Sequence, residues 1–175
     1  MAFYYFDASA LVKYYVTEPG SGWVRHLIEQ RDPETNQHYN IILVAEITRV
    51  EVAAGLAVIE RVGRIRRWDR DREYRRFTSQ LTHRYAIIPM ATTDLETAAD
   101  LTQHHPLKAY DAVQLAVALR YRRVLAARLP GGGQGHEFAF VSSDRTLVIA
   151  AQAEGLSADN PFDHLAPDDT SGGST

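Results

Sequence analysis

The chain begins with a short run of aromatic residues that ends at an acidic residue. Residues 3–6 are Phe-Tyr-Tyr-Phe, an apolar run too short for a buried helix, and aromatic residues favour strands. Asp7 follows this run, and the residues after it have helical character. The pattern predicts a buried strand with Asp7 at its C-terminal end, directly before a helix. Open α/β sheets bind their ligands at this end of the strands, so Asp7 is the first candidate for a site residue.

The same alternation of strand and helix continues along the chain. Short apolar runs predict further strands at residues 41–44, 85–89 and 138–141, with a short edge strand after Gly155. Helical patterns follow or separate these strands, at about residues 23–30, 45–62, 94–104, 111–119 and 147–151. Alternating strands and helices form a mostly parallel sheet with helices on both faces. The sequence therefore predicts a three-layer α/β/α sandwich.

Length and composition fit one domain followed by a tail. The chain has 175 residues, of which 45% are hydrophobic, so it can bury a substantial core. We expect a single domain over residues 1–157. Residues 158–175 are rich in Ser, Gly and Asp, and we expect them to be a disordered acidic tail.

Charge and cysteine content narrow the classes of partner and site. The net charge is −3, but the tail beyond Ala158 holds four Asp and no Lys or Arg, which leaves the rest at +1. A polyanionic partner therefore stays open. The absence of cysteine excludes disulfides and thiolate metal sites. No apolar stretch approaches a membrane span and the N-terminus does not resemble a signal peptide, so we expect a cytoplasmic protein without a membrane partner.

Acidic residues recur at the ends of the predicted elements. Asp144 follows the strand at residues 138–141 as Asp7 follows the first strand, and Asp111 stands at the start of the most apolar helix. The C-terminal ends of parallel strands meet at one edge, so Asp7 and Asp144 would converge if their strands are neighbours. Glu51 is preferred to Glu46 because its helical face also carries Ile47, Val50, Ala54 and Val58, where an unpaired carboxylate is costly.

Several carboxylates in one crevice repel one another and need protons or a cation. At an effective dielectric constant near 20, two such charges about 4 Å apart repel by about 4 kcal/mol. Oxygen ligands select hard cations, so Mg²⁺ or Mn²⁺ fits the set. One or two such ions could activate a water for attack on a phosphodiester. Taken singly, each Asp could instead be a helix cap and Glu51 could pair with a buried Arg; only the combination favours a site.

Four motifs in order along the chain resemble those of PIN-domain nucleases, and more narrowly those of the VapC-type toxins of toxin-antitoxin pairs. They lie at residues 7–13 (Asp-Ala-Ser-Ala-Leu-Val-Lys), 43–54, 107–116 and 140–147. The resemblance implies a PIN-like fold and an acidic site of Asp7, Glu51, Asp111 and Asp144, with Ser9 in support. It also implies an Mg²⁺- or Mn²⁺-dependent ribonuclease, often dimeric, that a small antitoxin protein inhibits.

Basic residues supply candidates for contacts with RNA. Lys13 and Lys108 are close in sequence to Asp7 and Asp111 and could meet a phosphate. Residues 61–76 hold eight arginines, but three interspersed acids favour a solvated, salt-bridged helix for most of them. The buried side of this segment is expected to come from Ile65, Trp68, Phe77 and Leu81. The Gly-rich residues 131–135 lack the context of a phosphate-binding loop.

We therefore expect a metal-dependent endoribonuclease that hydrolyses RNA. The alternative is a non-catalytic RNA-binding or interaction module that keeps the fold as a scaffold. A phosphatase with an aspartyl nucleophile ranks lower, because Ser9 stands where the common phosphatase motif has a second Asp.

Overall fold

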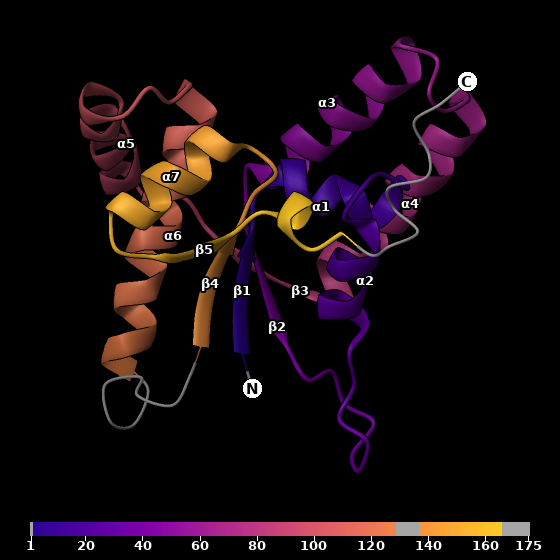
Figure 1. Ribbon diagram of the computed structural model, residues 1–175, viewed down its shortest axis with the longest axis horizontal. Coiled ribbons are helices and arrows are strands. Elements are labelled where there is room, and N and C mark those ends of the chain that lie inside the picture. Colours follow the sequence, from indigo (N-terminus) through magenta and orange to yellow (C-terminus); the bar gives the residue numbers. More distant parts are fainter. Residues whose placement is uncertain (1, 129–136, 166–175) are drawn as a thin grey trace.

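The computed structural model describes residues 2–128 and 137–165. Its centre is a sheet of parallel strands in the order β3-β2-β1-β4-β5 (Figure 1). The strands of the described part are β1 (Ala2–Phe6), β2 (Ile41–Ala45), β3 (Tyr85–Ile88), β4 (Glu137–Val141) and β5 (Ser157–Asp159). The predicted parallel sheet and edge strand are confirmed.

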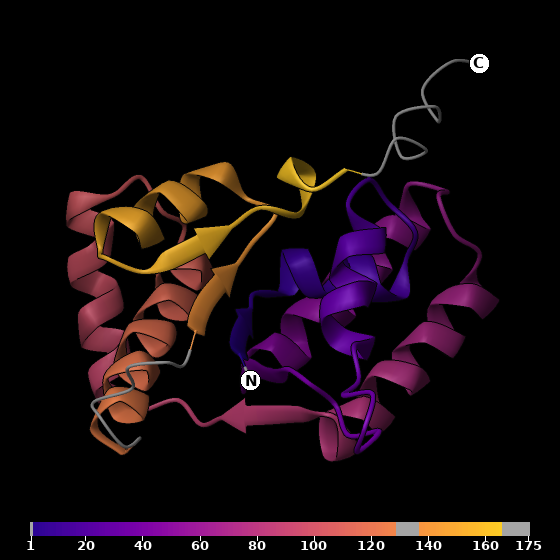
Figure 2. The same cartoon turned by 60° about the horizontal axis from the view of Figure 1, so that its bottom comes forward.

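Helices cover both faces of the sheet, as predicted. One group packs on one face and consists of α1 (Ala8–Tyr15), α2 (Ser21–Glu29), α3 (Thr48–Arg61) and α4 (Arg67–His83). The other group packs on the opposite face and consists of α5 (Thr92–His104), α6 (Ala109–Arg128) and α7 (Arg145–Ala153). Figure 2 shows the two groups on either side of the strands. A short 3₁₀ helix, η2 (Pro161–Asp163), follows β5.

Alternation along β1 divides the core in two. Phe3 and Tyr5 point to the face covered by α5, α6 and α7, and Phe6 points to the face covered by α1 to α4. Tyr5 stacks on Phe140 of β4, with ring centroids 5.5 Å apart. The aromatic run therefore builds both cores at once, which fixes the strand that carries Asp7.

The central position of β1 brings the strand ends together. β1 pairs in parallel with β2 on one side and β4 on the other, and the backbone N–H of Asp7 continues the ladder by donating to the carbonyl of Val141 at 3.1 Å. The residues that follow these strands therefore meet at one edge of the sheet, as predicted for Asp7 and Asp144.

The predicted buried face of the helix over residues 45–62 is wrong. The buried residues of α3 are Thr48, Val52, Leu56 and Ile59, whereas Val50 and Val58 are exposed. Both faces of this helix carry apolar residues. The face that packs against α1 is the one that carries Thr48 and Gly55, and the small size of Gly55 lets α3 approach α1 closely.

The charged segment follows the prediction except at Trp68. Phe77 and Leu81 are buried and Ile65 is partly buried, but Trp68 is 65% exposed and lies against Arg72. Arginines of α4 pair with acids of the same helix or its neighbours, such as Arg70 with Glu60 at 3.3 Å. Most of these contacts therefore agree with the predicted solvated, salt-bridged helix.

The predicted tail begins too early. Ala158 and Asp159 belong to β5, and the residues after them return to α1 and α2: Trp23 stacks on His164 with centroids 4.1 Å apart. Asn160 is buried and donates to the carbonyl of Ser143. Residues 166–175 of the predicted tail and the Gly-rich residues 131–135 lie outside the described residues.

Candidate active site

Asp7 is a buried carboxylate at the junction of β1 and α1. It caps α1, accepting the N–H of Ala10 at 3.0 Å, and it accepts the hydroxyl of Ser9 at 2.9 Å. Its pKa is raised from the ordinary 3.8 to about 7. Burial is the main cause and the charge of Glu51 adds to it, while these hydrogen bonds oppose the increase. The predicted cap and the predicted site residue are thus the same side chain.

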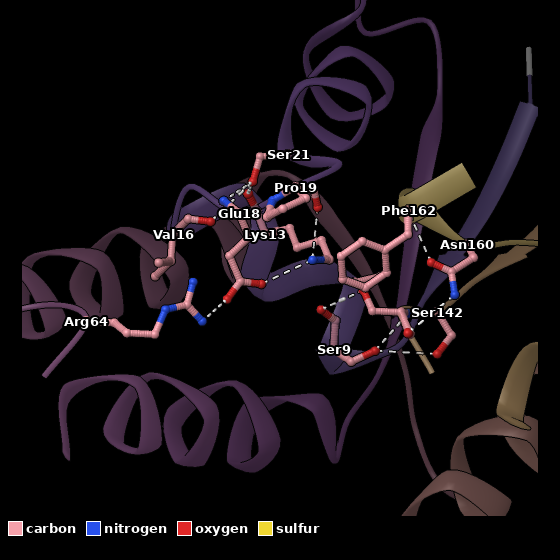
Figure 3. A network of polar contacts seen from close by, with 12 residues as sticks. Ser9, Lys13, Val16, Glu18, Pro19, Ser21, Arg64, Ser142, Asn160 and Phe162 are labelled. Carbon is pink, nitrogen blue, oxygen red and sulfur yellow. Dashed lines mark hydrogen bonds and ion pairs between the residues drawn. The ribbon is translucent and has the colours of Figure 1, made fainter. Parts of the chain in front are cut away.

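Ser9 joins the ends of β1 and β4. Its hydroxyl accepts the backbone N–H of Ser143 at 2.9 Å and lies 3.4 Å from the hydroxyl of Ser142 (Figure 3). Ser142 is buried and accepts the N–H of Asp144 at 3.0 Å. This network fixes Asp7 relative to the turn that carries Asp144.

Asp144 also combines two roles. Its carboxylate caps α7 by accepting the N–H groups of Thr146 at 2.7 Å and Leu147 at 3.2 Å. It is half-buried, and its charge raises the pKa of Asp111. Asp144 therefore faces the start of α6 across the edge of the sheet.

Glu51 is held by a buried amide. The Nε2 group of Gln114 donates to the Glu51 carboxylate and, at 2.9 Å, to the hydroxyl of Thr48. The Oε1 atom of Gln114 accepts the hydroxyl of Tyr5 at 2.7 Å. Burial raises the pKa of Glu51, and the charge of Asp111 adds to this effect. Glu51 thus lies near Asp7 and Asp111 although its helical face was predicted wrongly, whereas Glu46 is exposed as expected.

Asp111 lies in the first turn of α6, which begins two residues earlier than predicted. Its carboxylate accepts the backbone N–H of Lys108. Burial and the charge of Asp144 raise its pKa, and the charge of Lys108 opposes them. Lys108 is exposed, so it remains available to a ligand beside Asp111.

The four acids form an electrostatically linked set. Glu51 raises the pKa of Asp7, Asp111 raises that of Glu51, and Asp144 raises that of Asp111. Within residues 2–128 and 137–165, none of the four pairs with a Lys or Arg, whereas the buried Asp94 has Arg120 at 2.6 Å. In the same residues, no group of three or more acidic or histidine side chains is placed to hold one ion.

Lys13 does not lie where a phosphate could reach it. Its ammonium is buried, bonds the Glu18 carboxylate and the Pro19 carbonyl at 3.1 Å each, and lies 3.9 Å from the ring centre of Phe162 (Figure 3). Glu18 also pairs with Arg64. Lys13 therefore holds the turn after α1 and the η2 segment in place. The prediction that Lys13 contacts a phosphate of the substrate is corrected.

Sequence reasoning missed the residues that orient the acids. Gln114 stands within the apolar run of residues 112–119, where a single amide has no distinguishing signal. Ser142 and Ser143 did carry a signal, because two hydroxyl residues separate a strand end from Asp144.

Comparisons with known proteins identify the family from a sequence model and support the fold from a solved structure. A family model described as PIN domain matches residues 4–128, which include Asp7, Glu51 and Asp111 but end before Asp144. The crystal structure of PAE2754 from Pyrobaculum aerophilum is similar over 93% of this chain and 91% of that chain, with 17% sequence identity and a TM-score of 0.54. At this identity the similarity shows the fold alone. No curated protein matches the chain.

Proposed function

The chain belongs to the PIN domain family, and we propose that it is a metal-dependent endoribonuclease whose site is formed by Asp7, Glu51, Asp111 and Asp144. PIN domains are typically nucleases and generally use divalent metal ions. The observation that carries the proposal is the set of four linked carboxylates, one of them buried, without a basic partner among the described residues.

The chemistry of this set fits a hard divalent cation such as Mg²⁺ or Mn²⁺. A buried carboxylate without a basic partner is costly, and a cation would remove that cost. Magnesium commonly keeps several waters and binds through one or two carboxylates, so direct ligation by three is not required. Asp7 and Glu51, with Asp111 and Asp144 through water or directly, would hold one or two ions. Such an ion would offset the charge that develops on an RNA phosphate during hydrolysis.

The chain itself would supply orientation. Ser9 and the N–H of Ala10 fix the Asp7 carboxylate, and Gln114 fixes that of Glu51. Lys108, exposed beside Asp111, is the candidate for contact with an RNA phosphate. Fixed carboxylates need no reorganisation when substrate and ion arrive, which is the source of much catalytic stabilisation.

The biological role proposed is that of a toxin with a small antitoxin partner, acting as a homodimer. The order and identity of the four acidic motifs support this proposal through their resemblance to VapC-type toxins. The exposed valines of α3, Val50 and Val58, and Val62 directly after the helix offer an apolar surface that a protein partner could cover. Size-exclusion chromatography and an inspection of the adjacent reading frame test these points.

Cleavage of RNA with and without divalent ions tests the activity. Wild-type protein should cleave structured RNAs with Mg²⁺ or Mn²⁺ and should not cleave them with EDTA. Asp7→Asn keeps a residue that caps helices well but removes the charge, so it should lower the cleavage rate by about 10²-fold or more.

The matched control is Glu96→Gln, which removes one negative charge from an exposed position of α5. It should cleave as the wild type does. Metal-dependent cleavage that survives Asp7→Asn would show that the assigned site is wrong. Mn²⁺ that fails to bind in calorimetry would instead favour the non-catalytic module.

A further inference from the structure

A pocket of about 540 Å³ lies away from the acidic residues. Its walls include the C-terminal ends of α2 and α4 and the segment that joins α2 to β2, with Arg31, His38, His83 and Arg84 among the lining residues. β2 begins at Ile41 and β3 at Tyr85, so the pocket stands at the N-terminal edge of the parallel sheet. Figure 1 shows the α2–β2 segment extending from that edge, and Asp7 follows the opposite ends of the strands.

The basic groups of this pocket have no acidic partners in the described part of the chain. Arg84 is half-buried, and its Nε and Nη2 groups donate to the backbone carbonyls of Ile28 and Asn40. Arg31 donates to the carbonyl of Asn36 at 2.7 Å and lies 3.5 Å from the ring nitrogen of His38. Carbonyl oxygens accept hydrogen bonds but leave both positive charges uncompensated.

The one acidic residue in the lining is already engaged. The carboxylate of Glu29 accepts the hydroxyl of Tyr14 at 2.9 Å and lies 4.0 Å from Arg76 of α4. Glu29 therefore pairs with Arg76 and not with Arg31 or Arg84.

The basic groups destabilise one another's charge. Burial lowers the pKa of His38, and the charges of Arg84 and Arg31 lower it further, while Glu29 opposes them. Burial likewise lowers the pKa of Arg84. The charge of Arg31 lowers this pKa further, whereas Tyr85 and Tyr14 raise it. An anion in the pocket would relieve this repulsion.

We propose that this pocket binds the phosphate group of a small phosphorylated molecule of nucleotide size. The guanidinium groups of arginine match phosphate oxygens in geometry, and neutral imidazole N–H groups add donors. The volume falls within the range of small-molecule sites, and Tyr14 and Ile28 give the lining an apolar part. The assignment is independent of RNA cleavage, because the site uses none of the four acids.

Calorimetric titration at fixed, low salt tests the proposal directly. Inorganic phosphate and adenosine 5′-monophosphate should bind the wild-type protein one to one, and adenosine should not. Arg31→Ala should weaken both by about tenfold or more, since it removes an exposed charge-assisted donor. His38→Gln, which changes a second exposed lining residue, should weaken them less.

Arg67→Ala is the matched control. It removes the same charge from an exposed position at the start of α4, about 24 Å along the helix from His83. It should bind as the wild type does. Equal binding by Arg31→Ala and wild type would overturn the proposal, and so would equal loss in Arg31→Ala and Arg67→Ala.

An RNA end could present the same phosphate group, so a pair of short oligonucleotides, with and without a 5′-phosphate, completes the experiment. Displacement of adenosine 5′-monophosphate by the 5′-phosphorylated oligonucleotide alone supports the pocket and adds RNA ends as a source of its phosphate. Binding of both oligonucleotides without any binding of phosphate or mononucleotide overturns the small-molecule site.

Discussion

Asp7 makes the stability of the metal-free protein depend on pH. The folded protein holds the Asp7 proton more tightly than the unfolded chain, because its pKa is raised from 3.8 to about 7. The stability that Asp7 contributes is therefore fully present below about pH 4 and is lost as the pH rises through 7. The loss amounts to at most about 4 kcal/mol.

Asp7→Asn should remove this dependence. With EDTA present, the free energy of unfolding in urea should favour the variant over the wild type increasingly from about pH 4 to pH 8. Asn preserves the cap of α1, so the comparison isolates the charge. Parallel stability curves for the two proteins would contradict the raised pKa.

Gln114 should matter to the site beyond its contribution to stability. Gln114→Met removes the donor to Glu51 and leaves the hydroxyls of Tyr5 and Thr48 without their partner, at a cost of about 1–3 kcal/mol. Tyr5→Phe is the matched control, because it breaks the same network on the side away from Glu51. The rate of RNA cleavage is measured on both variants under conditions where both are folded. It should fall in Gln114→Met and stay at the wild-type value in Tyr5→Phe. Equal activity in the two would deny Gln114 a positioning role.

At the residue scale, the positions of the acids could be predicted from the sequence better than the contacts that orient them. Asp7 and Asp144 were found because a carboxylate at a strand end is visible in a linear pattern. Glu51 was selected by a helical face that is not the buried one, and a hydrogen bond from Gln114 holds its carboxylate in place. That contact joins residues 63 positions apart, which no local pattern contains.

At the element scale, Gly20 ties α2 to the returning C-terminal segment. It caps α2 with a φ angle of +85°, and an added Cβ would collide with the backbone carbonyl of Pro161 in η2. Gly20→Ala should therefore destabilise the protein by more than 1 kcal/mol, the usual cost of this backbone region for a residue with a side chain.

Gly22→Ala is the control two residues away. Its Cβ would meet nothing within 4 Å, and alanine favours the helix, so the variant should be about 0.5–1 kcal/mol more stable than wild type. Urea unfolding of both measures the difference. A neutral Gly20→Ala would mean that η2 does not pack against α2 in solution.

The elements themselves were predictable where a short apolar run meets a turn or an acid. Strands β1 to β4 were placed correctly because each is such a run, whereas the edge strand β5 (Ser157–Asp159) is not one and was expected only as a short strand after Gly155. The ordered part of the tail was not predictable, because residues 160–165 follow no strand or helix period and are held by distant contacts such as that between Trp23 and His164. Composition alone predicts that such a segment is disordered.

At the scale of the whole molecule, the two edges of the sheet carry opposite charge. Among the described residues, acids without basic partners gather at the C-terminal edge, and arginines without acidic partners gather at the N-terminal edge. Helices cover both faces, and none in the described part of the chain combines the length and hydropathy needed to cross a bilayer. Ligands of opposite charge should therefore stabilise the fold from opposite edges.

Mn²⁺ should raise the Tm of the whole domain, and more so at high pH. An ion bound only by the folded state stabilises it by about 2.7 kcal/mol at a concentration 100 times its Kd. Because the ion competes with the proton on Asp7, the increase should be larger at about pH 8 than at about pH 5.5. Asp7→Asn and Glu51→Gln should lose most of it, while Glu96→Gln should keep it. Phosphate should raise the Tm independently of these acids, because its pocket lies at the other edge, so an increase with phosphate that disappears in Asp7→Asn would show that the two edges are not separate sites.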